Sequence, residues 1–317
     1  MLAMDDRTLG RVLTPDLLQR LEAVAEVLPE RATTGSFPAL DWVEVLFTGW
    51  GCPPITPEVA DRAPRLRAIV HSAGSVKTFL DRSVLDRGIA VTSAVVANAI
   101  PVAEYTVAAI VLAGKRAFRY AAEYRRDRKP PEVGALGNYR TTVGLLGASR
   151  IGRMVADRLR AFDVEVLLSD PYLTDVPDGV RRCDLDELFE RSDVLSIHAP
   201  LLPETTGLVD ARLLAKLRDG AVLINTARGR IVDPVALERE CVSGRVDAIL
   251  DVTEPEPLPP DSPLLDLPNV MVTPHLAGAI GNEIARLGAL AVGEVERYVA
   301  GLGFEHAVDP KDWDRLA

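Results

Sequence analysis

The sequence predicts an α/β fold in which a Rossmann dinucleotide-binding domain is inserted into a smaller flavodoxin-like domain. Short apolar runs alternate with helix-start signals through the first hundred residues. At 142–170 an apolar run, a glycine-marked turn, a helical pattern and a second apolar run follow one another. With 317 residues the chain is long enough for two domains. The expected boundaries are 1–100 and 280–317 for the small domain and 101–279 for the insertion.

The individual elements follow from apolar patterns and helix-start signals. Strand candidates are Arg11–Leu13, Val43–Thr48, Leu66–His71, Ile89–Thr92, Thr142–Leu146, Val164–Leu168, Val194–His198, Ala221–Asn225, Val246–Leu250 and Val270–Thr273. Thr14-Pro15 and Thr56-Pro57 each place a hydroxyl residue before a proline, which favours a helix start. A long helix from Pro101 to about Arg128 would join the domains, and an amphipathic helix near Glu283–Val299 would return the chain. We expect ligands between the two domains.

The segment from Val143 to Gly152 has the pattern of a turn that binds nucleotide phosphates. Gly147 permits the tight turn, and Gly152 allows the following helix to pack close to the strand. The amides of Arg150 and Ile151 would lie at the helix N-terminus, where free N–H groups and the helix dipole favour a pyrophosphate.

Two further residues bear on which dinucleotide binds. Ser149 stands where the fingerprint has its second glycine, but serine is small and can donate a hydrogen bond, so binding is still expected. Asp170 ends the second apolar run, where an acid accepts hydrogen bonds from the adenosine ribose. No Lys or Arg follows at 171–174, so a 2′-phosphate would meet an unneutralised carboxylate. The predicted cofactor is therefore NAD, with NADH preferred over NADPH.

Composition limits the partners and the compartment. The chain has 46 Asp and Glu against 36 Lys and Arg, and its net charge of −10 would repel a nucleic acid. Cys52, Cys183 and Cys241 are scattered, so we expect no disulfides, no metal site and a cytoplasmic location. The N-terminus is acidic, unlike a signal peptide. No membrane span is expected, because the apolar run Val107–Ala113 falls far short of roughly 20 residues.

Three side chains with catalytic potential follow successive strand candidates in the second half of the chain. Arg228, Glu256 and His275 each lie just past a carboxyl end, where open parallel sheets bind ligands. A guanidinium can hold a carboxylate through two parallel hydrogen bonds. A carboxylate beside a histidine favours the imidazolium, which can donate a proton. Singly, each residue is more simply a surface or turn residue, but their joint order after a nucleotide fold indicates catalysis.

These segments together resemble the D-isomer-specific 2-hydroxyacid dehydrogenases, which include D-lactate, glyoxylate and D-3-phosphoglycerate dehydrogenases. The resemblance covers nearly the whole chain. Beyond the nucleotide turn it rests on Ser192–Pro200, Pro203–Gly207, Asn225–Arg230, Leu250–Val252, Glu256-Pro257 and Pro274-His275.

The resemblance implies an NAD-dependent oxidoreductase that interconverts a 2-keto acid and a D-2-hydroxy acid. His275 would act as the acid/base, Glu256 would orient it, and Arg228 would bind the substrate carboxylate. Residues implied to lie near the cofactor are Gly147, Ser149, Arg150, Ile151, Gly152, Asp170, His198, Pro200, Thr205, Thr226, Ala227, Asp251 and Gly278. A homodimer is also implied, with the Pro101 helix in its interface.

The substrate is less well defined by the sequence. The family binds the substrate carboxylate through backbone amides of a loop that corresponds to Ala73-Gly74-Ser75. The chain departs from the family pattern at Lys77, where aspartate is usual, and at Tyr105, where histidine is usual. We expect Lys77 to meet a second anionic group and Trp50 to wall the cleft. Which 2-hydroxy acid is bound stays open.

Two other functions stay open. A nucleotide-sensing regulator, similar to the corepressors that resemble this family, would bind NAD and act through partner proteins. The presence of all three catalytic positions speaks against it. A formate-type dehydrogenase would lack the pair formed by Glu256 and His275.

Overall fold

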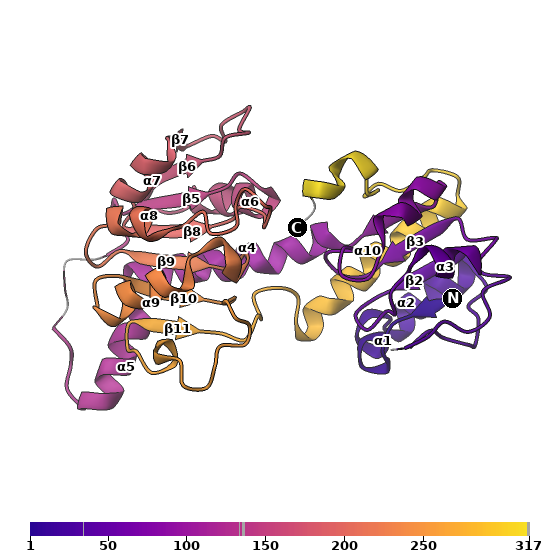
Figure 1. The fold of residues 1–317 in the computed structure, drawn as a ribbon, viewed down its shortest axis with the longest axis horizontal. Helices are drawn as coiled ribbons and strands as arrows, with labels where there is room; N and C mark the ends of the chain where they lie inside the picture. The colour runs from indigo at the N-terminus through magenta and orange to yellow at the C-terminus, as the bar shows by residue number, and fades with distance from the viewer. Residues whose placement is uncertain (34, 133, 135–136, 316–317) are drawn as a thin grey trace. The chain divides into compact units, whose positions relative to one another are not determined.

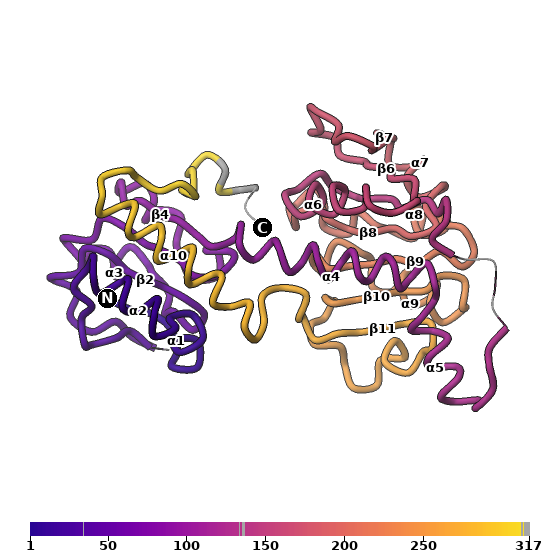
Figure 2. The backbone as a smooth tube through the Cα atoms, turned by 180° about the vertical axis from the view of Figure 1, so that it is seen from behind, coloured from indigo at the N-terminus to yellow at the C-terminus, as the bar shows by residue number. Residues whose placement is uncertain are grey.

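The computed structural model describes residues 1–317 except 34, 133, 135, 136, 316 and 317. It divides into two compact units (Figures 1 and 2). Unit 1 comprises Met1–Ala99 and Ala279–Ala317, and unit 2 comprises Ile100–Gly278. Along the chain, unit 2 is therefore an insertion within unit 1.

Unit 1 contains a four-stranded parallel sheet with the order β1-β2-β3-β4. Its strands are β1 (Leu2–Ala3), β2 (Val45–Thr48), β3 (Ala68–His71) and β4 (Ala90–Ser93). Ala3 also forms a parallel bridge with Ala32, so a second extended segment flanks β1 and gives the 2-1-3-4-5 order of flavodoxin-like folds. The helices are α1 (Asp6–Val12), α2 (Pro15–Val24), α3 (Pro57–Asp61) and α10 (Ile284–Val299), with 3-10 turns at Arg82–Arg87, Gly281–Glu283 and Pro310–Arg315.

The sheet of unit 1 has a hydrophobic core on each face. Phe47 and Val70 pack on one side in a cluster with residues of α1, α2 and α10. Leu46 and Ile69 pack on the other side in a cluster with residues of α3 and the neighbouring loops. Adjacent residues serve opposite cores because successive side chains of a strand point to opposite faces.

Unit 2 contains a seven-stranded parallel sheet with the order β11-β10-β9-β8-β5-β6-β7, which is the doubly wound Rossmann order with one added strand. The strands are β5 (Thr142–Leu146), β6 (Glu165–Ser169), β7 (Val180–Arg182), β8 (Val194–Ile197), β9 (Val222–Asn225), β10 (Asp247–Leu250) and β11 (Val270–Val272). The helices are α4 (Val95–Gly114), which begins in unit 1, α5 (Ala117–Asp127), α6 (Arg150–Leu159), α7 (Leu185–Arg191), α8 (Ala211–Lys216) and α9 (Pro234–Val242), with 3-10 turns at Gly229–Ile231 and Pro263–Leu265. Residues of α4 and α6 share one core cluster with the sheet, and residues of α7, α8 and α9 share the other.

One predicted strand was wrong. Arg11–Leu13 lies at the end of α1, and the first strand is Leu2–Ala3. The helix begins because the Asp5 carboxylate accepts a hydrogen bond from the Thr8 amide at 2.6 Å. Thr8 and Val12 are buried one helical turn apart, so the short apolar run belongs to a helical face.

The expected single helix from Pro101 to Arg128 was also wrong. α4 begins at Val95 with Pro101 inside it, and α5 is a separate helix. The break falls at Arg116, whose φ of 47° is in the left-handed region and whose guanidinium donates to the Gly220 carbonyl at 2.9 Å. The other predicted strands and the return helix are confirmed to within two residues at each end. Thr14 and Thr56 are N-caps as predicted, although neither hydroxyl caps the backbone.

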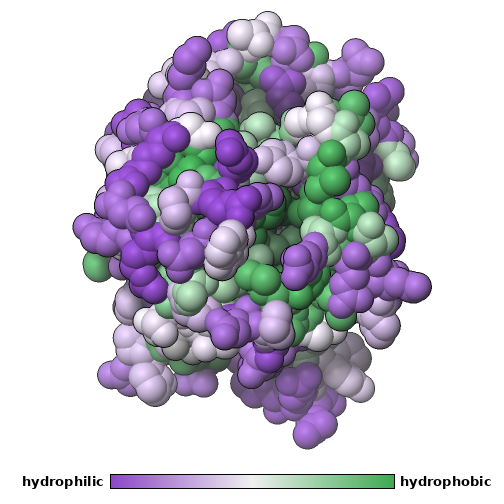
Figure 3. Space-filling view, turned by 90° about the vertical axis from the view of Figure 1, so that its right-hand side faces the viewer, coloured by the Kyte–Doolittle hydropathy of each residue, from purple (hydrophilic) through white to green (hydrophobic). Residues whose placement is uncertain are grey.

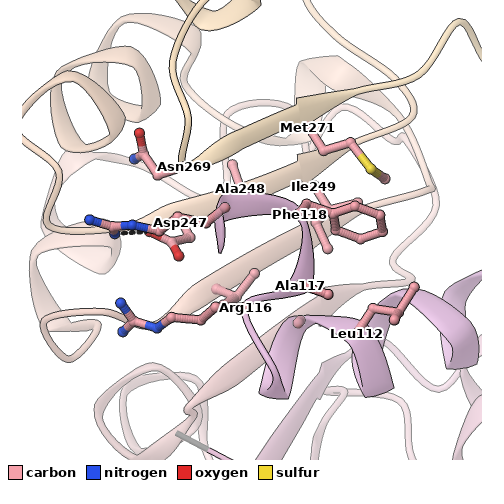
Figure 4. A pocket seen from close by; sticks show the side chains of 12 residues that line it. Leu112, Arg116, Ala117, Phe118, Asp247, Ala248, Ile249, Asn269 and Met271 are labelled. Atoms are coloured by element: carbon pink, nitrogen blue, oxygen red, sulfur yellow. Dashed lines mark hydrogen bonds and ion pairs between the residues drawn. The ribbon is translucent and has the colours of Figure 1, made fainter. Parts of the chain in front are cut away.

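A small pocket lies at this break, at the amino ends of β9, β10 and β11 (Figure 4). The Arg116 guanidinium and the Asp247 carboxylate are directed to the same side of it. Burial raises the pKa of Asp247, and an ion pair with Arg119 at 2.9 Å opposes this shift. The pocket is at the sheet edge opposite to the carboxyl ends, so it does not belong to the predicted site.

By length and composition alone, α4 could cross a bilayer, which the short run Val107–Ala113 did not indicate. Core helices meet the same criterion, and α4 has a core role. Ala103, Ala109, Ile110 and Ala113 are buried in the cluster that includes the strands of unit 2. This packing accounts for the apolar composition of the helix.

Exposed apolar side chains are scattered over the part of the chain that the structure describes. Figure 3 shows a face on which hydrophobic and hydrophilic side chains form interleaved patches. Such mixing is usual, because apolar atoms make up much of the surface of any folded protein. Trp42 is exposed, for example, but the Arg65 guanidinium lies over its ring at 5.3 Å.

Candidate active site

The turn between β5 and α6 depends on two glycines. Gly147 has a φ of +103°, and a Cβ there would lie 2.6 Å from the Ala199 amide nitrogen. A Cβ on Gly152 would lie 2.2 Å from the Gly147 carbonyl oxygen. Because both contacts are with backbone atoms, neither position tolerates a side chain without movement of the turn.

Ser149 does not need the conformational freedom of glycine. Its φ is −59°, and it is the N-cap of α6, where its hydroxyl accepts a hydrogen bond from the Gly152 amide at 3.3 Å. Arg150 and Ile151 follow in the first turn of α6, where amides have no acceptor within the helix. The serine therefore preserves the open helix N-terminus.

Asp170 follows β6 and is held against the glycine turn. Its carboxylate accepts hydrogen bonds from the Ala148 amide at 2.7 Å and from the Tyr172 amide at 2.8 Å. Arg153, which the sequence analysis missed, donates to the Ala148 carbonyl at 3.1 Å and pairs with Asp175 at 3.1 Å. The turn, the helix N-terminus and the fixed acid fit a dinucleotide, because the glycines keep side chains away from the backbone that would meet the pyrophosphate.

Three further cofactor candidates follow β8. His198 is buried, its Nε2 lies 2.9 Å from the Ser196 hydroxyl, and burial lowers its pKa to about 3, so the ring is neutral. The Thr205 hydroxyl donates to the Pro200 carbonyl at 2.6 Å and accepts from the Leu202 amide at 2.8 Å. These bonds shape the loop beside the glycine turn.

His275 and Glu256 form a hydrogen-bonded pair beyond the carboxyl ends of β10 and β11. Nδ1 of His275 lies 2.7 Å from Oε1 of Glu256, and both side chains are about half exposed. An ionised carboxylate only accepts, so Nδ1 carries the proton of this bond. Nε2 is then the atom left to exchange a proton with a substrate.

Arg228 lies just past β9, and its guanidinium is mostly buried. Burial lowers the pKa of Arg228, while the negative charge of Glu256 raises it, so the two side chains act on each other. Asn225, which the sequence analysis did not assign a role, accepts from the Ala227 amide at 3.0 Å and donates to the Arg228 carbonyl at 2.9 Å. The signal that the sequence offered for this role was an amide residue, Asn225, at the end of an apolar strand candidate.

Asp251 organises the segment that carries His275. The carboxylate is buried and accepts from the Thr273 hydroxyl at 2.6 Å and from the amides of Leu276 and Ala277 at 2.8 and 2.9 Å. His275 has a φ of 53°, and such strained backbone persists only where surrounding contacts fix it. Thr226 and Ala227 follow β9 at the same edge, and Gly278 is the last residue of unit 2.

Apart from Arg228, the predicted substrate-binding residues belong to unit 1. Trp50 follows β2 and is 41% exposed. Ala73, Gly74 and Ser75 follow β3, and a Cβ on Gly74 would meet only the Asn98 amide group at 3.8 Å, so protein packing does not require this glycine. The half-buried Lys77 donates its amide to the Ser75 hydroxyl at 3.4 Å.

A group with metal-ligand chemistry lies in unit 1, formed by Glu294, Glu305 and His306. The buried Glu294 carboxylate already accepts from the Thr92 hydroxyl at 3.0 Å and from the amides of Glu305 and His306 at 3.2 Å each. These bonds fix the segment after α10 beside β4, so we assign the group a structural role.

Comparison with known proteins relates this geometry to one family. The profile of the D-isomer specific 2-hydroxyacid dehydrogenase NAD binding domain matches residues 107–277. D-3-phosphoglycerate dehydrogenase of Archaeoglobus fulgidus is 33% identical over 269 residues, 81% of this chain and 51% of the relative. Glyoxylate reductase of Thermofilum pendens is 37% identical over 254 residues, 75% of this chain and 73% of the relative. The chain thus spans about half the length of the phosphoglycerate dehydrogenases it matches.

Solved structures extend the similarity to the whole fold. The TT0316 protein of Thermus thermophilus is 32% identical with a TM-score of 0.78, covering 98% of this chain and all of the other. D-lactate dehydrogenase of Aquifex aeolicus, in complex with NAD and lactic acid, is 26% identical with a TM-score of 0.74 over 97% and 99% of the chains. A 2-hydroxyacid dehydrogenase of Xanthobacter autotrophicus, in complex with NADPH, is 26% identical with a TM-score of 0.77 over 98% of each chain.

Proposed function

Because the chain belongs to the D-isomer specific 2-hydroxyacid dehydrogenase family, we propose that it is an oxidoreductase that interconverts a 2-keto acid and a D-2-hydroxy acid. The observation that carries this proposal is the pair of His275 and Glu256 at 2.7 Å, with Arg228 under the influence of the same carboxylate. The pair offers a proton donor and Arg228 offers a carboxylate anchor, which are the two groups that reduction of a 2-keto acid requires.

In the direction of reduction, the keto carbon would receive the hydride that a bound nicotinamide dinucleotide would supply. Arg228 holds the substrate carboxylate through paired N–H groups and draws electron density from the adjacent carbonyl. His275 donates the proton of Nε2 to the keto oxygen, while Glu256 keeps the ring oriented through Nδ1. The imidazole is left neutral and recovers a proton from solvent, since the side chain is half exposed. In the oxidation direction, Nε2 accepts the proton.

We propose NAD as the preferred cofactor, with unit 2 as the dinucleotide domain and unit 1 as the substrate domain. Asp170 supports the preference, because its fixed carboxylate would repel a 2′-phosphate. Arg153 is a cation in contact with the turn, but it is paired with Asp175. NADH and NADPH dissociation constants compared for the wild type and Asp170→Ala test this preference. Equal affinities for both cofactors in the wild type would reject it.

We propose that Trp50 and the Ala73-Gly74-Ser75 loop bind the substrate in unit 1, and that Lys77 favours substrates with a second anionic group. The positive charge of Lys77, two residues beyond Ser75, supports this assignment. A Lys77→Ala variant should lose the preference for oxaloacetate over pyruvate while it keeps turnover of pyruvate. An unchanged ratio of kcat/KM values would reject a role for Lys77 in selection.

We further propose a cytoplasmic homodimer with part of the Pro101 helix region in the interface. α5 supports this proposal, because Tyr124 on this helix is 55% exposed. Three free cysteines support a reducing compartment. Sedimentation at several concentrations tests the dimer, and a concentration-independent monomer would reject it.

The second candidate function is an NAD-sensing regulator of the corepressor type. The presence of Arg228, Glu256 and His275 favours the enzyme over this alternative. The decisive assay follows loss of NADH absorbance with glyoxylate, pyruvate, hydroxypyruvate, oxaloacetate and branched 2-keto acids, with NADPH in parallel. Turnover that His275→Gln abolishes supports the enzyme. NADH binding without turnover of any substrate supports the regulator.

A further inference from the structure

Two neighbouring side chains of α4 contact the segments that carry the catalytic candidates of unit 2. The Tyr105 hydroxyl lies 2.9 Å from the Thr273 hydroxyl, and the Thr106 hydroxyl lies 2.9 Å from the Thr226 hydroxyl. Thr273 lies two residues before His275, and Thr226 lies two residues before Arg228. One turn of α4 therefore meets the ends of both β9 and β11.

The direction of each hydrogen bond follows from the number of protons available. Thr273 donates its only hydroxyl proton to the Asp251 carboxylate at 2.6 Å, so Tyr105 must donate to Thr273. Burial and the charge of Asp251 raise the pKa of Tyr105, so this proton is retained. Thr106 donates to the Val102 carbonyl at 2.8 Å and therefore accepts from Thr226.

The hydrogen-bond chain that runs from Tyr105 through Thr273 ends at Asp251, next to the strained backbone of His275. The Asp251 carboxylate accepts hydrogen bonds from the Thr273 hydroxyl and from the amides of Leu276 and Ala277. Its partners therefore lie on both sides of His275 in the sequence. The φ of 53° at His275 places its backbone in a region that needs such support. A donor that fixes Thr273 thus limits the movement of the segment that aims Nε2.

We propose that Tyr105 and Thr106 are positioning residues for the reaction: Tyr105 holds the His275 segment through Thr273 and Asp251, and Thr106 holds the Arg228 segment through Thr226. This inference rests on the proposed dehydrogenase function for its kinetic consequence. Neither side chain is required to touch the substrate. Loss of either one should therefore lower kcat and make the segment that it holds less rigid. The substrate KM stays within about twofold.

The first test is Tyr105→Phe, which keeps the ring and removes only the donor. We expect kcat to fall about fivefold to tenfold, the net worth of one hydrogen bond. Amide hydrogen exchange should become faster in residues 273–277 and stay unchanged in α6 and β8, which separates local loosening from global destabilisation. Tyr105→His, whose imidazole can also donate, should recover part of kcat. Tyr139→Phe is the matched control, because Tyr139 is 72% exposed and lies outside α4 and α5.

The second test compares Thr106→Val with Thr106→Ser. The valine variant removes the acceptor of Thr226 at nearly constant volume, so we expect faster exchange in residues 226–228 and a smaller loss of kcat. The serine variant should behave as the wild type. Unchanged kcat and unchanged exchange in Tyr105→Phe and Thr106→Val would overturn the inference. A wild type that turns over no 2-keto acid would reject the proposed function instead. The hydrogen-exchange comparison needs no turnover, so it would still decide whether Tyr105 and Thr106 hold the two segments.

Discussion

The carboxyl edges of the two sheets carry different chemistry. In unit 1 the edge holds a buried histidine, His71, whose Nδ1 lies 2.9 Å from the Thr48 hydroxyl, followed by small residues of which Gly74 has no close neighbour at its Cβ position. In unit 2 the edge holds His275, half exposed and paired with Glu256. The proposed function assigns backbone binding of the substrate to the first edge and the acid/base step to the second.

The partner and the burial of the side chain separate His275 from the two buried histidines. Burial lowers the pKa of His71 to about 3, as it does for His198, so neither ring can supply a proton near neutral pH. Both have a hydroxyl partner, whereas His275 has a carboxylate partner and access to solvent. Position at or just past the carboxyl end of a parallel strand is common to all three and does not separate them.

The largest expected effect separates His275 from His71. His275→Gln should lower kcat by about 10²- to 10⁴-fold, the usual contribution of a general acid, with little change in melting temperature. His71→Gln should keep kcat within about threefold and lower the free energy of unfolding by roughly 1–3 kcal/mol, because it disturbs a buried hydrogen bond. Steady-state kinetics and thermal unfolding of both variants check this contrast. Equal losses of kcat in the two variants would contradict it.

The sequence was sufficient to predict the Rossmann domain, although not the edge strand β7, because its motifs record local constraints. Gly147 is required by its φ of +103°, Gly152 is required by a backbone contact with Gly147 inside the turn, and Asp170 is held by that same turn. Charged residues that follow strands were equally visible, and Glu256 and His275 do meet.

Contacts between distant residues could not be predicted in this way. Thr273 and Tyr105 are 168 positions apart, and each is an ordinary residue of its local pattern. Arg153 pairs with Asp175, 22 positions away, and it lies outside residues 171–174, where a cation was sought. The break at Arg116 depends on the Gly220 carbonyl, which no helical periodicity records. The functional roles of the loop at Ala73–Ser75 stay predictions, since backbone binding leaves little trace in side-chain identity.

The next prediction sharpens the contrast at the nucleotide turn. Gly152→Ala places a Cβ 2.2 Å from the Gly147 carbonyl oxygen, so the turn must shift. We expect the NADH dissociation constant to rise at least tenfold and the free energy of unfolding to fall by about 1–3 kcal/mol. Gly293→Ala is the control, because its Cβ meets no atom within 4 Å in α10 and the change should stabilise by about 0.5–1 kcal/mol. Fluorescence titration with NADH that finds Gly152→Ala unchanged would refute the packing argument.

The buried histidines predict an acid dependence of stability. The pKa values of His71 and His198 are about 3 when folded and about 6.5 when unfolded. Between these values the unfolded chain binds more protons, so their stability contribution is complete above pH 6.5 and is lost as the pH falls toward 3. At pH 5 the expected loss is on the order of 2 kcal/mol for each histidine. Urea unfolding at pH 7 and pH 5 should show a smaller difference for His71→Gln and His198→Gln than for the wild type, and equal differences would contradict the prediction.

The smallest expected effect concerns Ser149, where the chain departs from the fingerprint. Its hydroxyl caps α6 through a long bond of 3.3 Å, so Ser149→Ala should cost about 0.5 kcal/mol of stability, at the low end for an N-cap, and Ser149→Gly only a few tenths. Because the φ of −59° suits any residue, neither change should alter the NADH dissociation constant more than about threefold. A much tighter complex in Ser149→Gly would mean that the serine side chain hinders the approach of the cofactor. The departure from the fingerprint would then weaken binding instead of preserving the helix N-terminus.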